Sequence, residues 1–171
     1  MDREWPFRGH VIAVVALYVL DSFVLDQGVV TVLVALVMLI LGFVHLGLGA
    51  DEDDLARARH GVRMIAIYVA LVLAVITTVR INSWIARARG ERIVVALKRY
   101  GATRGRYPDR LQDLVPEYLP SVPLAKYGLV FNQFSYWYHA DQEDGFLMYT
   151  SMPPFGRRVY RLSTGHWSFM D

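Results

Sequence analysis

The chain of 171 residues contains no cysteine. This absence excludes a disulfide framework, a thiolate metal site and a cysteine nucleophile, and it leaves the redox compartment undetermined. Three familiar catalytic patterns are missing as well: Gly-x-Ser-x-Gly, His-Glu-x-x-His and a Walker phosphate loop. We therefore expect no enzymatic activity, although a Ser/His/Asp group formed only by folding stays open as an alternative.

Charge is scarce in three stretches of the N-terminal half, at about 10–25, 29–50 and 62–80. As a helix the second stretch is about 33 Å long, which matches the hydrocarbon core of a bilayer at about 30 Å. The first stretch could be a signal peptide, but the residues before it carry no net positive charge and no A-x-A cleavage site follows. The sequence thus predicts a three-helix membrane anchor over residues 1–83 and a soluble head over residues 84–171.

Basic residues at the ends of these stretches predict the orientation. Arg3 and Arg8 precede the first stretch, residues 26–28 have no Lys or Arg, and Arg57 and Arg59 lie in the second link. Because basic flanks stay in the cytoplasm, we expect a multi-pass inner-membrane protein with a cytoplasmic N-terminus and a periplasmic head. Four arginines after the third stretch favour the opposite orientation; they are Arg80, Arg87, Arg89 and Arg92.

The third helix is expected to continue beyond the membrane. Apolar residues recur at three- and four-residue steps from residue 81 to Tyr100, with Gly90 as a weak point and Gly101 as the C-cap. The acidic run at residues 51–54 is expected to cap the start of this helix. In the preceding stretch, Gly42, Gly47 and Gly49 permit close helix contact.

The head is predicted to be α+β. Pro108 is expected to begin a short helix with Asp109 in its first turn, and Pro116 is expected to end it. Strand-like stretches follow as "LVFNQFSYWYHA", "FLMYTSM", "RRVYRL" and "HWSFM". We expect them to form two antiparallel hairpins packed on the long helix, with a core supplied by the 16 aromatic residues, of 22 in the chain, that follow residue 83.

One passage of the head resembles a known family. The residues that carry the resemblance are Ala96-Leu97, Tyr100, Gly105, Tyr107-Pro108, Leu111, Leu114-Val115-Pro116, Tyr118-Leu119, Pro123 and a closing "TGHW" turn. Over residues 84–168 they resemble the soluble domain of type II secretion major, G-like pseudopilins. This resemblance implies a periplasmic domain that packs against protein partners. The three-helix anchor departs from the family, and its peptidase site is not recognisable at residues 1–30 or ahead of Val62, so we do not expect processing as an ordinary pseudopilin.

The resemblance also suggests a calcium site. Asp141, Glu143 and Asp144 form an acidic loop, and carboxylate oxygens suit this hard cation. The three residues are too close together for an EF-hand loop, and a solvated hairpin turn is the favoured interpretation. Calcium is the one cofactor to consider; otherwise we expect none.

Ionisable residues in the anchor raise a second possibility. His10, His45 and His60 all fall near the inner interface, where a group of them could bind a metal or sense pH. We favour isolated histidines, because the helices that carry them need not face one another. Asp21 would be costly deep in the bilayer, so it either faces protein or water or reaches the outer surface, and we expect the latter.

The expected function is contact with another protein. Aromatic residues and arginine concentrate binding energy at interfaces, which favours a docking face of Tyr136, Trp137, Tyr138, Arg157 and Arg158. Besides membrane lipid, we expect the partner to belong to a secretion, pilus or other envelope assembly. The alternative is an immunity protein that neutralises a toxin at the envelope. Nucleic acid is not expected, and a membrane enzyme would require a deep polar pocket joining His139 or His166 to a carboxylate.

Overall fold

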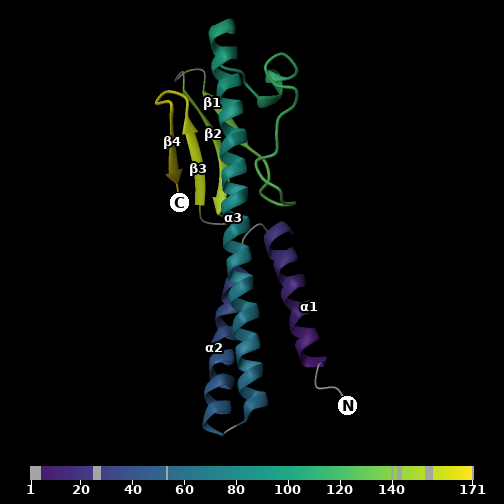
Figure 1. Cartoon of the computed structure of the whole chain (residues 1–171). Helices are drawn as coiled ribbons and strands as arrows, with labels where there is room; N and C mark the ends of the chain where they lie inside the picture. Colours follow the sequence, from purple (N-terminus) through teal and green to yellow (C-terminus); the bar gives the residue numbers. More distant parts are fainter. Residues whose placement is uncertain are drawn as a thin grey trace. The chain divides into compact units, whose positions relative to one another are not determined.

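The computed structural model describes residues 5–24, 28–52, 54–139, 141, 144–152 and 156–170. The chain divides into two compact units, Met1–Val79 and Arg80–Asp171. The first unit is helical, and the second combines a helix with a four-stranded antiparallel sheet (Figure 1). The predicted α+β class is therefore confirmed.

Four helical segments shape the first unit. They are α1 (Trp5–Val19), a π-helical turn (Leu20–Val24), α2 (Val29–Asp51) and the first part of α3 (Leu55–Arg104). Among the described residues, α2 and α3 are the two helices long and apolar enough to cross a membrane. The first expected span is helical too, but α1 has only 15 residues before the π-helical turn begins. The structure thus accounts for two of the three predicted spans.

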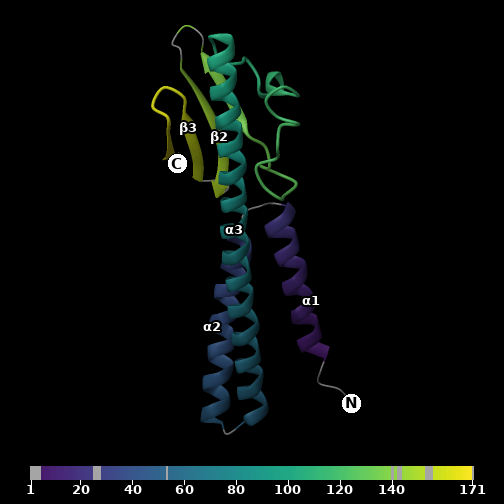
Figure 2. The same ribbon diagram turned by 45° about the horizontal axis from the view of Figure 1, so that its top comes forward.

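The α2–α3 hairpin is closely packed through glycine, and the two helices run side by side in Figure 2. A Cβ atom on Gly61 would lie 2.6 Å from the Leu46 nitrogen and 2.7 Å from the Gly42 oxygen, and one on Gly49 would overlap the backbone of Ala58. Gly47 meets nothing within 4 Å. Two of the three glycines expected at helix contacts, Gly42 and Gly49, therefore lie in this interface.

Asp21 is buried, so the prediction that it reaches the outer surface is wrong. Its side chain is 1% exposed, and Oδ2 accepts a hydrogen bond of 2.7 Å from the backbone N–H of Thr31. The N-cap residue of α2 is Gly28, at φ 67°, and it has no side chain to cap the helix. A carboxylate from the preceding turn therefore binds an N–H group in the first turn of α2.

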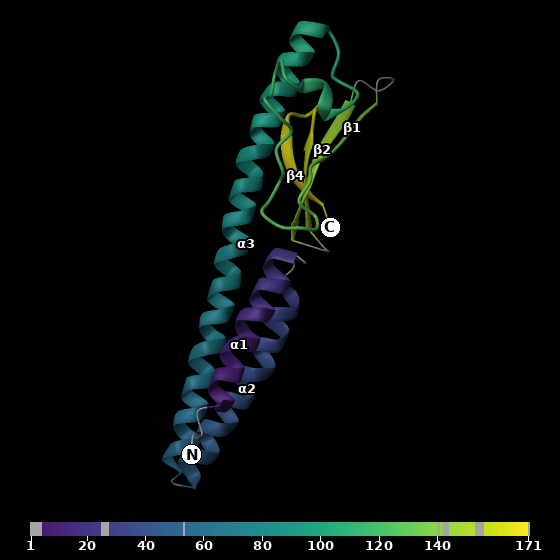
Figure 3. The ribbon, with the colours of Figure 1, turned by 90° about the vertical axis from the view of Figure 1, so that its right-hand side faces the viewer.

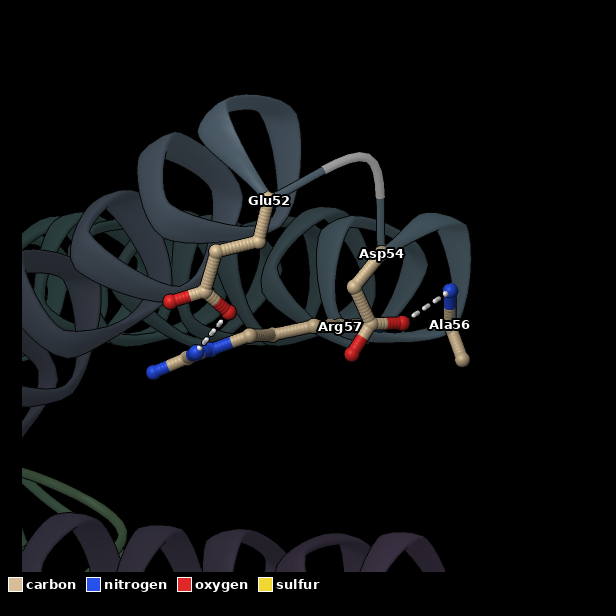
Figure 4. A network of polar contacts seen from close by, with 4 residues as sticks. All are labelled: Glu52, Asp54, Ala56 and Arg57. Atoms are coloured by element: carbon tan, nitrogen blue, oxygen red, sulfur yellow. Dashed lines mark hydrogen bonds and ion pairs between the residues drawn. The ribbon is translucent and has the colours of Figure 1, made fainter.

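The link between α2 and α3 is stabilised by two acidic side chains (Figure 4). Asp54 Oδ1 accepts hydrogen bonds from the N–H groups of Ala56, at 3.0 Å, and Arg57, at 3.1 Å. Glu52 forms an ion pair with Arg57 at 2.7 Å. Asp54 thus confirms the expected capping by the acidic run, whereas Asp51 ends α2 and Asp53 lies outside the described residues.

Helix α3 continues to Arg104, so the prediction that Gly101 caps it is wrong. Gly105 takes the left-handed conformation at φ 73°, and its N–H donates to the Gly101 oxygen at 2.9 Å. Gly101 instead leaves room for an aromatic ring, because a Cβ there would lie 3.3 Å from the ring of Tyr107. The close approach of this ring explains glycine at a position inside the helix.

The short helix of the head is a 3₁₀ turn at Leu111–Leu114. It begins three residues later than predicted, and its acidic residue is Asp113, which accepts the Arg110 N–H at 3.0 Å, not Asp109. Pro108 instead uses its carbonyl to accept a hydrogen bond of 2.9 Å from the Tyr136 hydroxyl. The helix ends at Leu114, before Pro116, as expected.

The sheet contains β1 (Ser135–His139), β2 (Asp144–Met152), β3 (Gly156–Arg161) and β4 (His166–Met170), in that order. Both predicted hairpins are present, and pairing of β2 with β3 joins them into one sheet. The strand predicted from Leu129 begins only at Ser135. Figure 3 shows α3 running along the face of this sheet within the second unit.

The core of the second unit lies between α3 and the sheet. Ile93 and Leu97 of α3 are fully buried, as are Leu147 of β2 and, at 2% exposure, Tyr160 of β3. Each large apolar side chain buried in this way contributes about 1.5–3 kcal/mol.

Gly90 lets an aromatic ring reach the helix backbone. A Cβ at Gly90 would lie 3.0 Å from the indole ring of Trp167, whose Nε1–H donates to Glu91 at 2.8 Å. The ring centroid of Trp167 lies 5.7 Å from that of Tyr149 and 5.3 Å from that of Tyr160. The aromatic core expected from the sequence is thus present, and it reaches α3 at Gly90.

Candidate interaction surface

The face of the sheet opposite α3 is the candidate interaction surface. Side chains of a strand alternate between the two faces, so residues that face away from the core occur at every second position. We define the outer face by the residues that line its hollow: Trp137, Phe146, Met148, Arg157, Val159, Arg161, Thr164, His166, Ser168 and Met170. The strand registers place Trp137 opposite Phe146, Met148 opposite Val159 and Arg157 opposite Met170. All four strands therefore contribute to one continuous face.

The outer face is hollowed and largely apolar. The hollow has a volume of about 660 Å³. Trp137 and Met170 remain about half exposed, at 49% and 46%. A tryptophan that packs against no core and borders an apolar hollow is typical of a surface that another molecule covers.

Two arginines give this face a positive charge. Arg161 lies over the ring of Phe146, 4.9 Å from its centroid, and forms an ion pair with Asp144 at 3.9 Å. Arg157 makes no ion pair with any residue that the structure describes. One arginine of the outer face therefore keeps its charge uncompensated by the described residues.

Asp144 is held in its ionised form. Burial raises its pKa, but hydrogen bonds from Ser163 and Gly145, together with the charge of Arg161, outweigh this effect and lower the pKa overall. The N–H of Gly145 donates to Oδ1 at 2.8 Å and that of Ser163 at 3.1 Å. Asp144 thus ties the start of β2 to the turn after β3.

The predicted docking residues do not share one face. Trp137 and Arg157 lie on the outer face, but Tyr136, Tyr138 and Arg158 point to the core side. The pKa of the Tyr136 hydroxyl is raised, as expected on the core side. Burial is the main cause, and smaller contributions come from the neighbouring Tyr138, Tyr107, Asp109 and Asp113.

Two of the residues on the core side make further ring contacts. The ring of Tyr138 lies 5.7 Å from that of Tyr107, and Arg158 lies 5.4 Å from the centroid of Phe169. A run of adjacent aromatic residues on a strand cannot form one patch, because alternation divides it between two faces. The same alternation would have found Phe146, Met148 and Met170, which the sequence reasoning missed.

The calcium prediction falls partly outside the described residues, because Glu143 is not among them. Asp141 is exposed, and both carboxylate oxygens of Asp144 already have protein partners. Within the described ranges, no group of three His or acidic side chains is arranged to hold a metal ion.

The three histidines of the first unit come together, contrary to the expectation that they are isolated. The ring centroids of His45 and His60 lie 5.4 Å apart, and those of His10 and His60 lie 6.1 Å apart. His10 Nδ1 is 3.4 Å from the Tyr68 hydroxyl. The sequence could not give this result, since it does not show which faces of α1, α2 and α3 meet.

The two head histidines lie on different strands of the sheet. His166 lines the hollow of the outer face, and none of the described residues lining that hollow is a carboxylate. His139 is the last residue of β1 and lies opposite Asp144 in the strand register.

Comparison with protein-family models, with curated proteins and with solved structures gave no match. The function must therefore be inferred from the residues of the chain itself.

Proposed function

We propose that the chain is a non-catalytic inner-membrane protein whose periplasmic head binds an envelope protein through the outer face of its sheet. The observation that carries this proposal is the continuous outer face itself, where the half-exposed Trp137 and Met170 line the same hollow as Arg157, which has no ion pair with any described residue. Tryptophan and arginine are the residues most enriched where interfaces concentrate their binding energy.

Attachment to a membrane is supported by the surface of the first unit. In the most apolar window of α2 only 17% of the residues are buried, and in that of α3 only 22%. A core helix of a soluble protein would be mostly buried, whereas lipid tails can cover such surfaces. Residues Val14 and Tyr18 of α1 pack against this pair of helices, which supports α1 as the third helix of the anchor.

The partner is expected to present carboxylates beside apolar side chains. The hollow accepts apolar groups between Trp137, Met148 and Met170, and Arg157 can pair with an acidic residue at its border. Such complementarity of charge favours one partner over others of similar shape.

The resemblance to pseudopilin soluble domains remains part of the proposal. It favours a secretion, pilus or other envelope assembly as the source of the partner. The alternative, an immunity protein, would bind a toxin with the same face. Both functions require a head outside the cytoplasm, as the arginines of the second link predict.

Site-specific photocrosslinking in cells tests the interface. A photoreactive phenylalanine analogue at Met148 should crosslink one protein, whereas the analogue at the exposed Arg106 should not. Arg157→Glu should abolish the crosslink because it repels an acidic partner, and Arg106→Glu is the charge-matched control. Mapping of the crosslinked peptide should find Asp or Glu near the attachment point; equal crosslinking from both positions, or a basic peptide, would refute the proposal.

Reporter fusions test the topology. Alkaline phosphatase fused after Asp171 should be active, and a fusion in the link near Glu52 should be inactive, because this enzyme folds only outside the cytoplasm. The reversed pattern would place the head in the cytoplasm and exclude an envelope partner.

A further inference from the structure

A second hollow lies at the link between α2 and α3, within the first unit. It has a volume of about 810 Å³ and is lined by His45, Asp54, Ala56, Arg57, Arg59, His60 and Arg63. Three arginines therefore face one aspartate in this lining. The lining therefore carries more positive than negative charge, although three further acidic residues, 51–53, precede Asp54 in the chain, and a basic lining favours an anion as the occupant.

The individual contacts sharpen this expectation. Arg57 is paired with Glu52 at 2.7 Å, and Asp54 uses Oδ1 to cap α3, so part of the charge at the hollow is already compensated. Arg59 is exposed and makes no ion pair with any described residue. A ligand is thus expected to depend most on Arg59.

The histidines add hydrogen-bonding groups to the hollow. His45 Nδ1 is buried and has no hydrogen-bond partner among the described residues. The His60 ring lies next to it, with centroids 5.4 Å apart. Two imidazoles and a guanidinium group together supply donors for a tetrahedral oxyanion, and a buried nitrogen without a partner gains most from such a ligand.

The surroundings of the hollow indicate which anion it takes. The link joins the two helices that are apolar enough to span a bilayer, and exposed Val62 and Leu55 lie beside the arginines in α3. Lipid phosphates lie at the ends of helices that span a bilayer, and the acyl chains lie along the apolar surface of such helices.

We propose that the hollow formed by Arg57, Arg59, Arg63, His45 and His60 binds the phosphate group of an anionic lipid. The inference rests on the membrane attachment in the proposed function, and it adds a specific lipid site to it. A metal ion is the competing occupant of a histidine cluster, but the arginines repel cations, and Ca²⁺ or Mg²⁺ would find few oxygen ligands there.

Lipid titration of the intact protein in neutral detergent tests the site. Phosphatidylglycerol should raise the melting temperature and remain bound in native mass spectrometry, whereas phosphatidylcholine, which has no net charge, should do neither. Inorganic phosphate and glycerol 3-phosphate at the same concentration should have little effect, because they lack the acyl chains. Equal stabilisation by inorganic phosphate would assign the site to a soluble anion and overturn the lipid proposal.

Two variants separate this site from general attraction to a charged surface. Arg59→Gln and His60→Gln should each weaken phosphatidylglycerol binding, with roughly a tenfold loss for Arg59→Gln. Arg80→Gln is the matched control, because Arg80 borders the same apolar part of α3 but does not line the hollow. Equal losses in Arg59→Gln and Arg80→Gln would overturn the proposal. So would stabilisation by Zn²⁺, reversed by a chelator, without any response to phosphatidylglycerol.

Flotation with vesicles distinguishes the two proposals. If the protein floats with phosphatidylcholine vesicles but phosphatidylglycerol gives no added stability, the lipid site is refuted and membrane attachment stands. If the protein floats with neither kind of vesicle, membrane attachment itself is refuted.

Discussion

Helix α3 runs through both units, and the exposure of its apolar side chains differs between them. In the first unit Leu73 is 59% exposed, together with Val62 and Ile76 at similar values. In the second unit Ile93 and Leu97 are fully buried under the sheet. A uniformly apolar stretch and an amphipathic stretch can thus form one helix, with the first left open on its surface and the second covered by a protein core.

Two kinds of polar contact stabilise the units, at helix starts and between distant elements. In the first unit Asp21 and Asp54 bind N–H groups at helix starts, where the backbone has no partners of its own. In the head, side chains such as Trp167 and Tyr136 connect elements far apart in sequence. The first unit has a contact of this second kind too, between the Tyr18 hydroxyl and Thr78 Oγ1 at 2.6 Å, so its helices are joined by side chains as well as capped.

The largest effect is expected from one substitution made in both units. Leu97→Ala should lower the free energy of unfolding of the head by about 2–5 kcal/mol, because it leaves a cavity in the core. Leu73→Ala in the same helix should change it by less than about 0.5 kcal/mol, because that side chain is exposed. Urea unfolding of the whole chain in detergent, followed by tryptophan fluorescence, measures both. Equal losses would break the comparison and show that Leu73 packs against protein.

A smaller effect is expected from glycine in α2. Gly49→Ala should destabilise the helix pair by about 1–3 kcal/mol, because the added Cβ meets the backbone of Ala58. Gly47→Ala should be neutral or stabilising, since nothing lies within 4 Å and alanine favours the helix. Thermal unfolding in detergent compares the two variants. A loss at Gly47 as large as that at Gly49 would contradict the glycine contact.

The smallest effect is expected from acid and belongs to the head alone. The pKa of Asp144 is lowered in the folded state, so its contribution is present above the unfolded value of about 3.9 and is lost as the pH falls through the folded value. The loss should be below about 1 kcal/mol, because the carboxylate is partly exposed. Urea unfolding between pH 3 and pH 7 should therefore show a steeper decline for the native head than for Asp144→Asn. Identical pH profiles would show that the folded state does not favour the ionised form.

Much of the fold followed from local patterns. Apolar runs predict α2 and the apolar part of α3, aromatic-rich stretches with turn residues between them predict the hairpins, and the acidic run predicts the cap at Asp54. The predicted helix boundaries are wrong where tertiary contacts are made. Helix α3 continues past Gly101, against which the ring of Tyr107 packs. Pro108 does not begin the short helix, and its carbonyl accepts a hydrogen bond from Tyr136. Neither contact can be read from neighbours in the sequence.

The candidate surfaces were predicted less well than the fold. The sequence shows the aromatic and arginine clusters, but alternation places Trp137 and Arg157 on the outer face and their neighbours on the side of the sheet that faces α3. The histidine cluster and the buried place of Asp21 depend on which faces of three helices meet, and periodicity in uniformly apolar helices does not define a face. The residue types were therefore recognised, and their grouping was not.

Gly90 has a consequence for the end of the chain. A methyl group at this position would crowd the indole of Trp167, and the ring would have to shift away from α3, which strains its hydrogen bond to Glu91. Strand β4 lies at the edge of the sheet, so it would keep its pairing with β3 and its aromatic contacts but lose part of its attachment to α3. At a cost of about 1 kcal/mol of helix propensity at one residue, α3 thus gains a direct contact with the edge strand near the end of the chain.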